Sequence, residues 1–119
     1  MGNGLKLVKV SLLLLHMALL AWMSVGTSYP GPIESLFRKV GSLVLHVIGY
    51  FLLAMLFAWV FMARGKRAVL MALPGAFLYG LALEVVQIYL PARGFSGMDI
   101  LLNLVGSCAG TLSSLIFLA

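Results

Sequence analysis

Charged residues are scarce in this chain, at 9% of its 119 residues. Soluble globular domains carry about 25%. Eight residues are Lys or Arg, and only three are acidic, namely Glu34, Glu84 and Asp99. Hydrophobic residues make up 63% of the chain, and the mean hydropathy is +1.15. This composition excludes an ordinary soluble domain and indicates an integral membrane protein.

Cysteine is scarce as well, which excludes several kinds of site. The single Cys108 rules out an internal disulfide and any metal motif built from several cysteines. The chain also has no nucleotide-binding loop, zinc motif or nucleophile elbow, so we expect neither a metal nor a cofactor. The net charge of +5 is spread over the ends of the apolar segments, where membrane topology and lipid headgroups explain it. We therefore expect no nucleic-acid partner.

Long hydrophobic runs are abundant. A helix needs about 20 mostly apolar residues to cross a membrane, and four segments qualify, at about residues 7–25, 40–63, 69–90 and 99–118. Turn-forming or basic breaks separate them, reading "GTSYPGPIESLFRK", "RGKR" and "PARGFSGM". Helices satisfy their own backbone polar groups in lipid. The sequence therefore predicts an all-α integral membrane bundle of four transmembrane helices, in one domain over residues 1–119.

Basic residues set the expected orientation of this bundle. The side that holds the N-terminus and the second break carries Lys6, Lys9, Arg64, Lys66 and Arg67, and the opposite side carries Arg38, Lys39 and Arg93. The positive-inside rule then favours both termini in the cytoplasm. In the first segment, an apolar run follows Lys6 and Lys9 and ends in "SVG". This pattern is also typical of a cleaved signal peptide. We favour a retained helix, because the run is long enough to span.

Three polar side chains fall at one expected depth in the bundle. Glu84 lies seven residues before Pro91, where the third helix must end, and is therefore about 10 Å inside the membrane. His46 lies about 10 Å inside the second helix and Asn103 about 9 Å inside the fourth. At helical spacing, Gln87 and Asp99 lie one turn shallower and Tyr50 one turn deeper. The predicted outward-facing pocket comprises His46, Tyr50, Glu84, Gln87, Asp99 and Asn103, with Arg93 at its mouth.

Each of these residues also has a purely structural interpretation. An ionised acid at the bilayer centre costs about 2.5–3.5 kcal/mol, so Glu84 could be a neutral acid hydrogen-bonded to another helix, although acids within membranes are usually functional. Asp99 could cap a helix N-terminus. Arg93 could extend into headgroups, or bind phosphate. Packing or helix–helix hydrogen bonding could account for His46, Tyr50, Gln87 and Asn103.

The stretches "LHVIGYFLLAML" and "LEVVQIYLPARGFSGMDILLNLVGSCAG" resemble the VanZ-like family, over about residues 7–117. The family pattern is His-x-x-x-Tyr, Glu-x-x-Gln, a Pro/Gly–Arg loop and Asp-x-x-x-Asn-x-x-Gly. It matches His46, Tyr50, Glu84, Gln87, Arg93, Asp99, Asn103 and Gly106. The family often has an acidic residue ahead of the His, where this chain has Ser42. Any role of that acid is therefore in doubt here.

The resemblance implies a multi-pass protein of the bacterial cytoplasmic (inner) membrane. The name-giving member is associated with resistance to teicoplanin, a glycopeptide that binds cell-wall precursors at the outer face. We therefore expect a protein that binds or modulates a cell-envelope lipid or cell-wall precursor at that face, with a link to glycopeptide resistance. The expected partners are membrane lipids or a lipid-linked precursor. A second copy of the chain or another membrane protein remains open as a further partner.

Other functions are open on the sequence. A membrane enzyme acting on an envelope lipid would use His46, Glu84 and Asp99 as catalytic candidates, with Glu84 or His46 as the acid or base. A carrier would change the protonation of Glu84, but "FLLAMLFAWVF" below Tyr50 offers no polar path. A structural subunit is the remaining alternative. We favour a binding protein over an enzyme.

Overall fold

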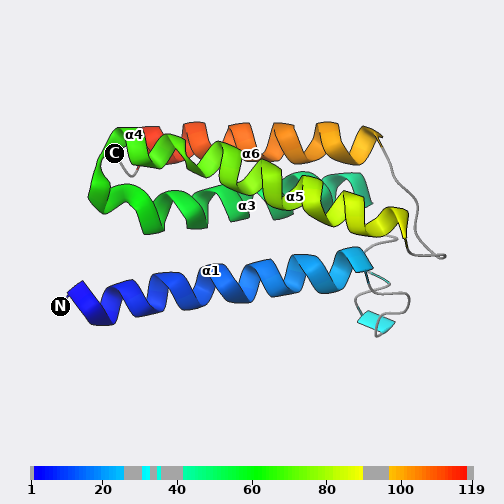
Figure 1. The fold of residues 1–119 in the computed structure, drawn as a ribbon, viewed down its shortest axis with the longest axis horizontal. Coiled ribbons are helices and arrows are strands. Elements are labelled where there is room, and N and C mark those ends of the chain that lie inside the picture. Colours follow the sequence, from blue (N-terminus) through cyan, green and yellow to red (C-terminus); the bar gives the residue numbers. More distant parts are fainter. Residues whose placement is uncertain (1, 26–30, 33–34, 36–41, 90–96, 118–119) are drawn as a thin grey trace.

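The computed structural model describes residues 2–25, 31–32, 35, 42–89 and 97–117, and this part of the chain contains helices and no strand. Its elements are α1 (Gly2–Val25), α3 (Ser42–Phe61), the 3-10 helix η1 (Met62–Arg64), α4 (Lys66–Leu70), α5 (Ala72–Ile88) and α6 (Gly97–Phe117) (Figure 1). Four stretches are long and apolar enough to cross a membrane, namely Asn3–Ser24, Val44–Arg64, Lys66–Ile88 and Gly97–Phe117. The prediction of an all-α membrane bundle of four helices is confirmed.

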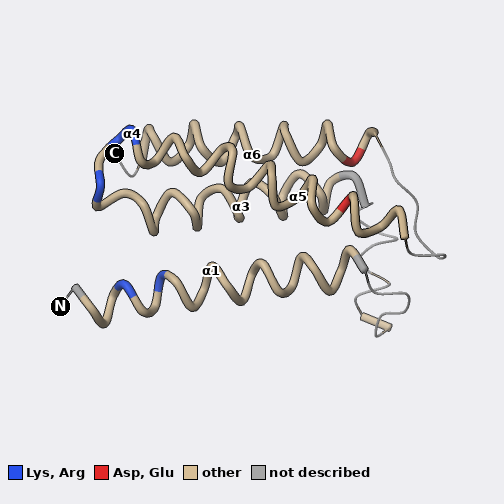
Figure 2. Tube along the Cα trace, in the orientation of Figure 1, with Lys and Arg blue, Asp and Glu red and all other residues tan. Residues whose placement is uncertain are grey.

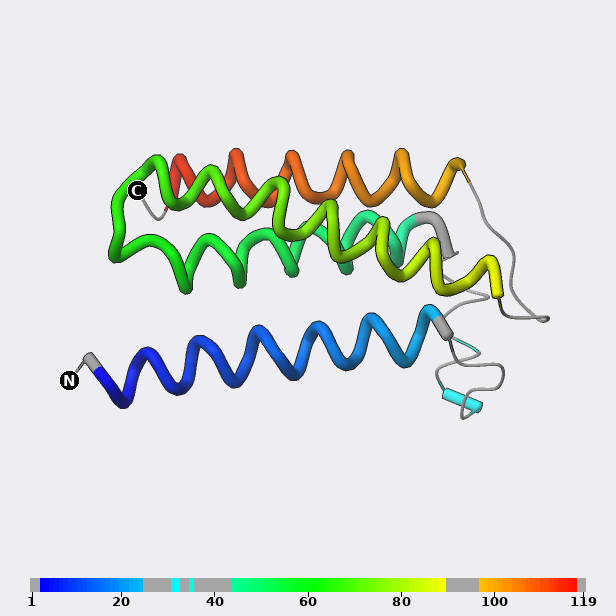
Figure 3. Tube along the Cα trace, viewed as in Figure 1, coloured from blue at the N-terminus to red at the C-terminus, as the bar shows by residue number. Residues whose placement is uncertain are grey.

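The helices run along a common axis, and the two ends of the bundle differ in their chemistry. In Figure 1, α3, α5 and α6 pack side by side, and α1 lies along this group. The N-terminus, the C-terminus and α4 lie at one end. Figure 3 shows that the start of α3, the end of α5 and the start of α6 meet at the other end, although they are far apart in the sequence. This second end holds the candidate site.

Two glycines bring α6 into close contact with α3. A Cβ atom at Gly106 would lie 2.5 Å from the carbonyl oxygen of Val47, and one at Gly110 would overlap the carbonyl oxygen of Phe51. Only glycine allows the two backbones to approach this closely, and Cα–H groups can then contact carbonyl oxygens across the interface. The two glycines of the segment "GSCAG", from Gly106 to Gly110, therefore allow the close contact of α6 with α3.

A turn and a break separate α3 from α5. Gly65 has φ of 98°, in the region that favours glycine, and it reverses the chain between η1 and α4. The break between α4 and α5 falls at Met71, just before Pro74. Proline has no N–H and its ring clashes with the carbonyl group four residues earlier, which here belongs to Leu70. The proline therefore accounts for the end of α4 at that residue.

Helix α1 is the most exposed of the four long helices, with 11% of its apolar window buried. Leu13 and Leu20 are its buried contributions to the apolar core. Side chains also fix it to the bundle. The Nε2 atom of His16 lies 2.8 Å from the carbonyl oxygen of Gly49, and because a carbonyl can only accept, His16 donates through Nε2–H. Another hydrogen bond runs from the Tyr79 hydroxyl to a backbone carbonyl of α1.

Candidate functional site

The polar residues of the candidate site come from three helix ends that meet at one end of the bundle. His46 lies near the start of α3, Glu84 lies four residues before the end of α5, and Asp99 lies in the first turn of α6. Figure 2 places the described acidic residues at this end and the described Lys and Arg residues at the opposite end. The described part of the chain therefore concentrates its acidic groups at one end.

His46, Glu84 and Asp99 form a compact cluster. One ligand atom from each lies within 4.8 Å of the others, and His46 Nε2 lies 3.9 Å from Asp99 Oδ2. That separation exceeds hydrogen-bond length, and a bridging polar atom fits such a gap. Glu84 is only 2% exposed, whereas the side chains of His46 and Asp99 are 23% and 24% exposed. The cluster thus has a buried acid at its base and two more accessible groups at its rim.

A second polar layer lies one helical turn further in. Tyr50 and Asn103 follow His46 and Asp99 at a spacing of four residues, and both are almost completely buried. The rings of His46 and Tyr50 stack with centroids 6.0 Å apart. Gly80, one turn before Glu84, leaves room for this layer, since a Cβ atom there would lie 2.5 Å from Asn103 Nδ2 and 2.7 Å from Tyr50 Cε1.

The Asn103 amide lies beneath the cluster with its hydrogen-bond donor and acceptor unused by the described residues. The residue is 1% exposed, and neither Nδ2 nor Oδ1 has a hydrogen-bond partner in the described part of the chain. Leaving a buried polar group unsatisfied costs about 1–3 kcal/mol. The floor of the site therefore presents a donor and an acceptor that a polar ligand group can use.

The expected depths need a correction. The sequence analysis placed Asn103 level with His46 and Glu84, and Asp99 one turn above them. The structure brings Asp99 to the level of His46 and Glu84, and Asn103 lies beside Tyr50 in the inner layer. The error arose from the end of the third helix, because α5 ends at Ile88 rather than at the proline three residues later. Glu84 is therefore closer to the end of the bundle than expected.

Two predicted site residues are not in the described cluster. Gln87 is buried, and its Nε2 donates a 2.7 Å hydrogen bond to the carbonyl oxygen of Ser24. The amide thus links α5 to α1. Arg93, predicted at the mouth of the pocket, lies outside the described residues. The structure accordingly brings together His46, Tyr50, Glu84, Asp99 and Asn103.

The cluster is rich in hydrogen-bond acceptors. It combines two carboxyl groups with one imidazole, and in a low-dielectric membrane two neighbouring carboxylates repel each other strongly. A ligand that brings N–H or O–H donors, such as an amine, an amide or a sugar hydroxyl, relieves this repulsion. His46 and the carboxyl groups can also exchange protons with a bound group.

The same three residues include the donor types of a divalent metal site. Ligands at about 2.0 Å from a tetrahedral zinc ion are about 3.3 Å apart. The 3.9 Å between His46 Nε2 and Asp99 Oδ2 is wider than this. His46, Glu84 and Asp99 would need small side-chain rotations before they could coordinate one ion together. From the sequence we expected these three groups in one pocket, but we expected no metal there.

Sequence reasoning also missed a buried polar stripe along α6. Asn103, Ser107, Thr111 and Ser114 recur at spacings of three or four residues, and all are buried. Ser114 donates a hydrogen bond to the carbonyl oxygen of Gly110, a common arrangement for hydroxyls in membrane helices. The helical spacing of these residues was the available signal. The apolar stretch "FLLAMLFAWVF" of α3, from which the absence of a polar path was inferred, says nothing about α6.

Comparison with known proteins identifies one family. A family model described as VanZ/LLP1 matches residues 5–118, which is nearly the whole chain. The match includes every residue of the cluster and its inner layer. Neither the curated proteins nor the solved structures that were compared with this chain give a match.

Proposed function

Because the chain belongs to the VanZ/LLP1 family, we propose that this membrane protein binds a cell-envelope lipid or a lipid-linked cell-wall precursor at the outer face of the bacterial cytoplasmic membrane. The observation that carries the proposal is the convergence of His46, Glu84 and Asp99 within 4.8 Å at one end of a bundle of four mostly apolar helices. Glycopeptides such as teicoplanin act on cell-wall precursors at that face, so ligand binding here would link the protein to resistance.

The polar site suits a headgroup rather than an acyl chain. The rim groups His46 and Asp99 are partly accessible, while Glu84 and the Asn103 amide lie beneath them. A sugar or peptide headgroup carries the N–H and O–H donors that carboxylates accept, together with carbonyl oxygens that the Asn103 amide can bind. The lipid tail would remain in the bilayer against the apolar faces of the helices.

The experiment is mass spectrometry of lipids that copurify with the protein in mild detergent. The wild type is expected to be enriched in one envelope lipid relative to the membrane extract, and Glu84→Gln and Asp99→Asn are expected to lose most of it. Thr111→Val is the matched control, since it removes a buried polar group further along α6 and should retain the lipid. Equal amounts of bulk phospholipid alone in the wild type and Glu84→Gln would refute specific binding.

A second candidate function is an enzyme that acts on such a lipid. The observation that favours it is the approach of Asp99 to His46, because a carboxylate beside an imidazole can orient the ring for proton transfer. In this case Glu84 or His46 would be the acid or base. Glu84→Gln would then abolish product formation from an added lipid extract while the copurified lipid stayed bound. A pure binding protein would yield no product even as the wild type.

A further inference from the structure

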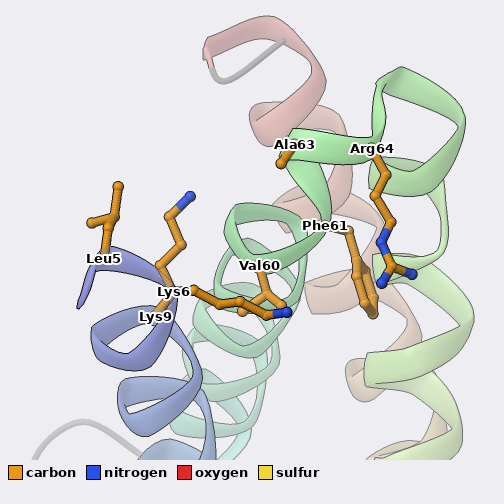
Figure 4. Close-up of a pocket in the computed structure, with 7 residues that line it drawn as sticks. All are labelled: Leu5, Lys6, Lys9, Val60, Phe61, Ala63 and Arg64. Atoms are coloured by element: carbon orange, nitrogen blue, oxygen red, sulfur yellow. The ribbon is translucent and has the colours of Figure 1, made fainter. Parts of the chain in front are cut away.

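A groove lies at the opposite end of the bundle from the candidate site. It runs between the start of α1 and the junction of α3 with η1, and it encloses about 330 Å³. Lys6, Lys9 and Arg64 give it positive charge, and Leu5, Val60 and Phe61 give it apolar walls (Figure 4). The groove therefore combines positive charge with an apolar lining.

No described acidic residue offsets the charge of this groove. Lys66 and Arg67 add two exposed cations just beyond Arg64, and the described acidic residues lie at the other end of the bundle (Figure 2). Clustered cations at a membrane surface repel one another and attract anionic lipid, at about 1 kcal/mol for each Lys or Arg. A group with negative charge would therefore be attracted to this end.

Lys9 is fixed in place by an aromatic ring. Its Nζ atom lies 5.3 Å from the centre of the Trp59 ring, in a cation–π contact between α1 and α3. Figure 4 shows the Lys9 side chain extending from α1 toward Val60, while the Arg64 side chain extends back beside Phe61. Tryptophan is enriched where headgroups meet acyl chains. A tryptophan beside these cations is what a groove at headgroup level would have, and the cations lie near an apolar wall.

We propose that this groove binds an anionic glycerophospholipid. The phosphate would lie among Lys6, Lys9 and Arg64, where a guanidinium can bind two phosphate oxygens at once, and an acyl chain would lie along the apolar walls. The positive-inside rule assigns this end to the cytoplasmic leaflet, whose anionic lipids match the charge of the groove. A free phosphate ion could use the cations but would gain nothing from Leu5, Val60 or Phe61.

This lipid site is independent of the proposed headgroup site. It uses α1, α3 and η1 at the opposite end of the bundle and shares no residue with the cluster of His46, Glu84 and Asp99. Loss of lipid from one site should therefore leave the other occupied. The two proposals can fail separately.

The test is native mass spectrometry of the full chain released from nanodiscs that contain phosphatidylglycerol and phosphatidylcholine in equal amounts. The wild type should retain phosphatidylglycerol at least fivefold over phosphatidylcholine. Arg64→Gln and Lys9→Gln should each lower this preference by about fivefold. The matched control is Lys66→Gln with Arg67→Gln, which removes two cations at the same end. Neither side chain lines the groove, so a lipid held in the groove should keep its preference within about twofold, whereas general attraction to the surface charge would be lost by more.

Further measurements fix the meaning of each outcome. Lys9→Arg keeps the charge and should restore retention, and circular dichroism establishes that each variant is folded. Equal retention of the two lipids by the wild type would overturn the proposal, as would an equal loss in the control outside the groove. Displacement of the lipid by 10 mM inorganic phosphate would also overturn it, since the groove would then bind a free anion.

Discussion

Gly80 offers the sharpest test of how the candidate site is built. It lies on α5, and a Cβ atom there would approach Asn103 Nδ2 to 2.5 Å and Tyr50 Cε1 to 2.7 Å. Ordinary contacts of a Cβ atom start at about 3.4 Å, so Gly80→Ala creates overlaps of about 0.9 Å with Asn103 and about 0.7 Å with Tyr50. Because Tyr50 and Asn103 are 2% and 1% exposed, neither can swing away. The helix must move instead, which separates the two layers of the site.

Gly75 on the same helix is the matched control. A Cβ atom there would meet only the Phe57 ring, at 3.7 Å. Both Gly→Ala changes gain about 1 kcal/mol of helix propensity, so this term cancels in the comparison. Overpacking a core costs about 1–3 kcal/mol. We therefore expect Gly80→Ala to have a lower free energy of unfolding than Gly75→Ala by about 1–3 kcal/mol.

Reversible unfolding in mixed micelles, followed by circular dichroism, measures this difference. Copurified lipid gives a second readout, since a displaced Asn103 should weaken retention at the candidate site. The reasoning is refuted if the two variants unfold at the same denaturant concentration and both retain the lipid. In that case the packing of Tyr50 and Asn103 against α5 would not depend on the missing side chain at Gly80.

Three further predictions concern packing and orientation. Gly106→Ala should destabilise the bundle by about 1–3 kcal/mol, measured by the same unfolding, because its Cβ would overlap a carbonyl oxygen of α3; stability equal to the wild type would contradict the contact. Tyr79→Phe should cost about 0.6–2 kcal/mol, because the hydroxyl donates to a backbone carbonyl of α1; an unchanged unfolding midpoint would show that this bond is unimportant. In a Cys108→Ala background, Met98→Cys should react with a membrane-impermeant maleimide on intact cells, and Lys66→Cys only after permeabilisation; the reverse pattern would invert the orientation.

The sequence was sufficient for the helices and for most of the cluster. Runs of apolar residues located the four spans, and expected depth with helical spacing selected the polar residues, which the resemblance then matched. The exact helix ends were less predictable. Helix α1 begins at Gly2, five residues before the predicted start, because hydropathy marks the apolar run and not the polar turn that extends it. The end of the third helix mattered most. The predicted segment ended at residue 90, whereas α5 ends at Ile88, and this difference changed which polar groups share a level.

The contacts between helices could not be read from the sequence. Gln87 matched the family pattern, and the sequence did not predict that its Nε2 donates to the Ser24 carbonyl oxygen of α1. Gly80 carried no motif, although it makes room for Tyr50 and Asn103. Both roles depend on how α5 is rotated about its axis, which weak amphipathicity leaves undetermined. Only the packing of α5 against three other helices fixes that rotation.

The cluster is an expensive way to hold three helices together. Ser107, Thr111 and Ser114 on α6 show a milder one, since their small side chains are buried without adding charge, although the Ser107 and Thr111 hydroxyls have no hydrogen-bond partner among the described residues. Helices in lipid need no more than this close packing and occasional hydrogen bonds. Placing Glu84 and Asp99 near each other adds desolvation and repulsion, and the buried Asn103 amide adds unsatisfied donors and acceptors. A ligand headgroup that pairs with the Asn103 amide and donates to the carboxyl groups offsets these costs, which is why we favour binding over a purely structural role.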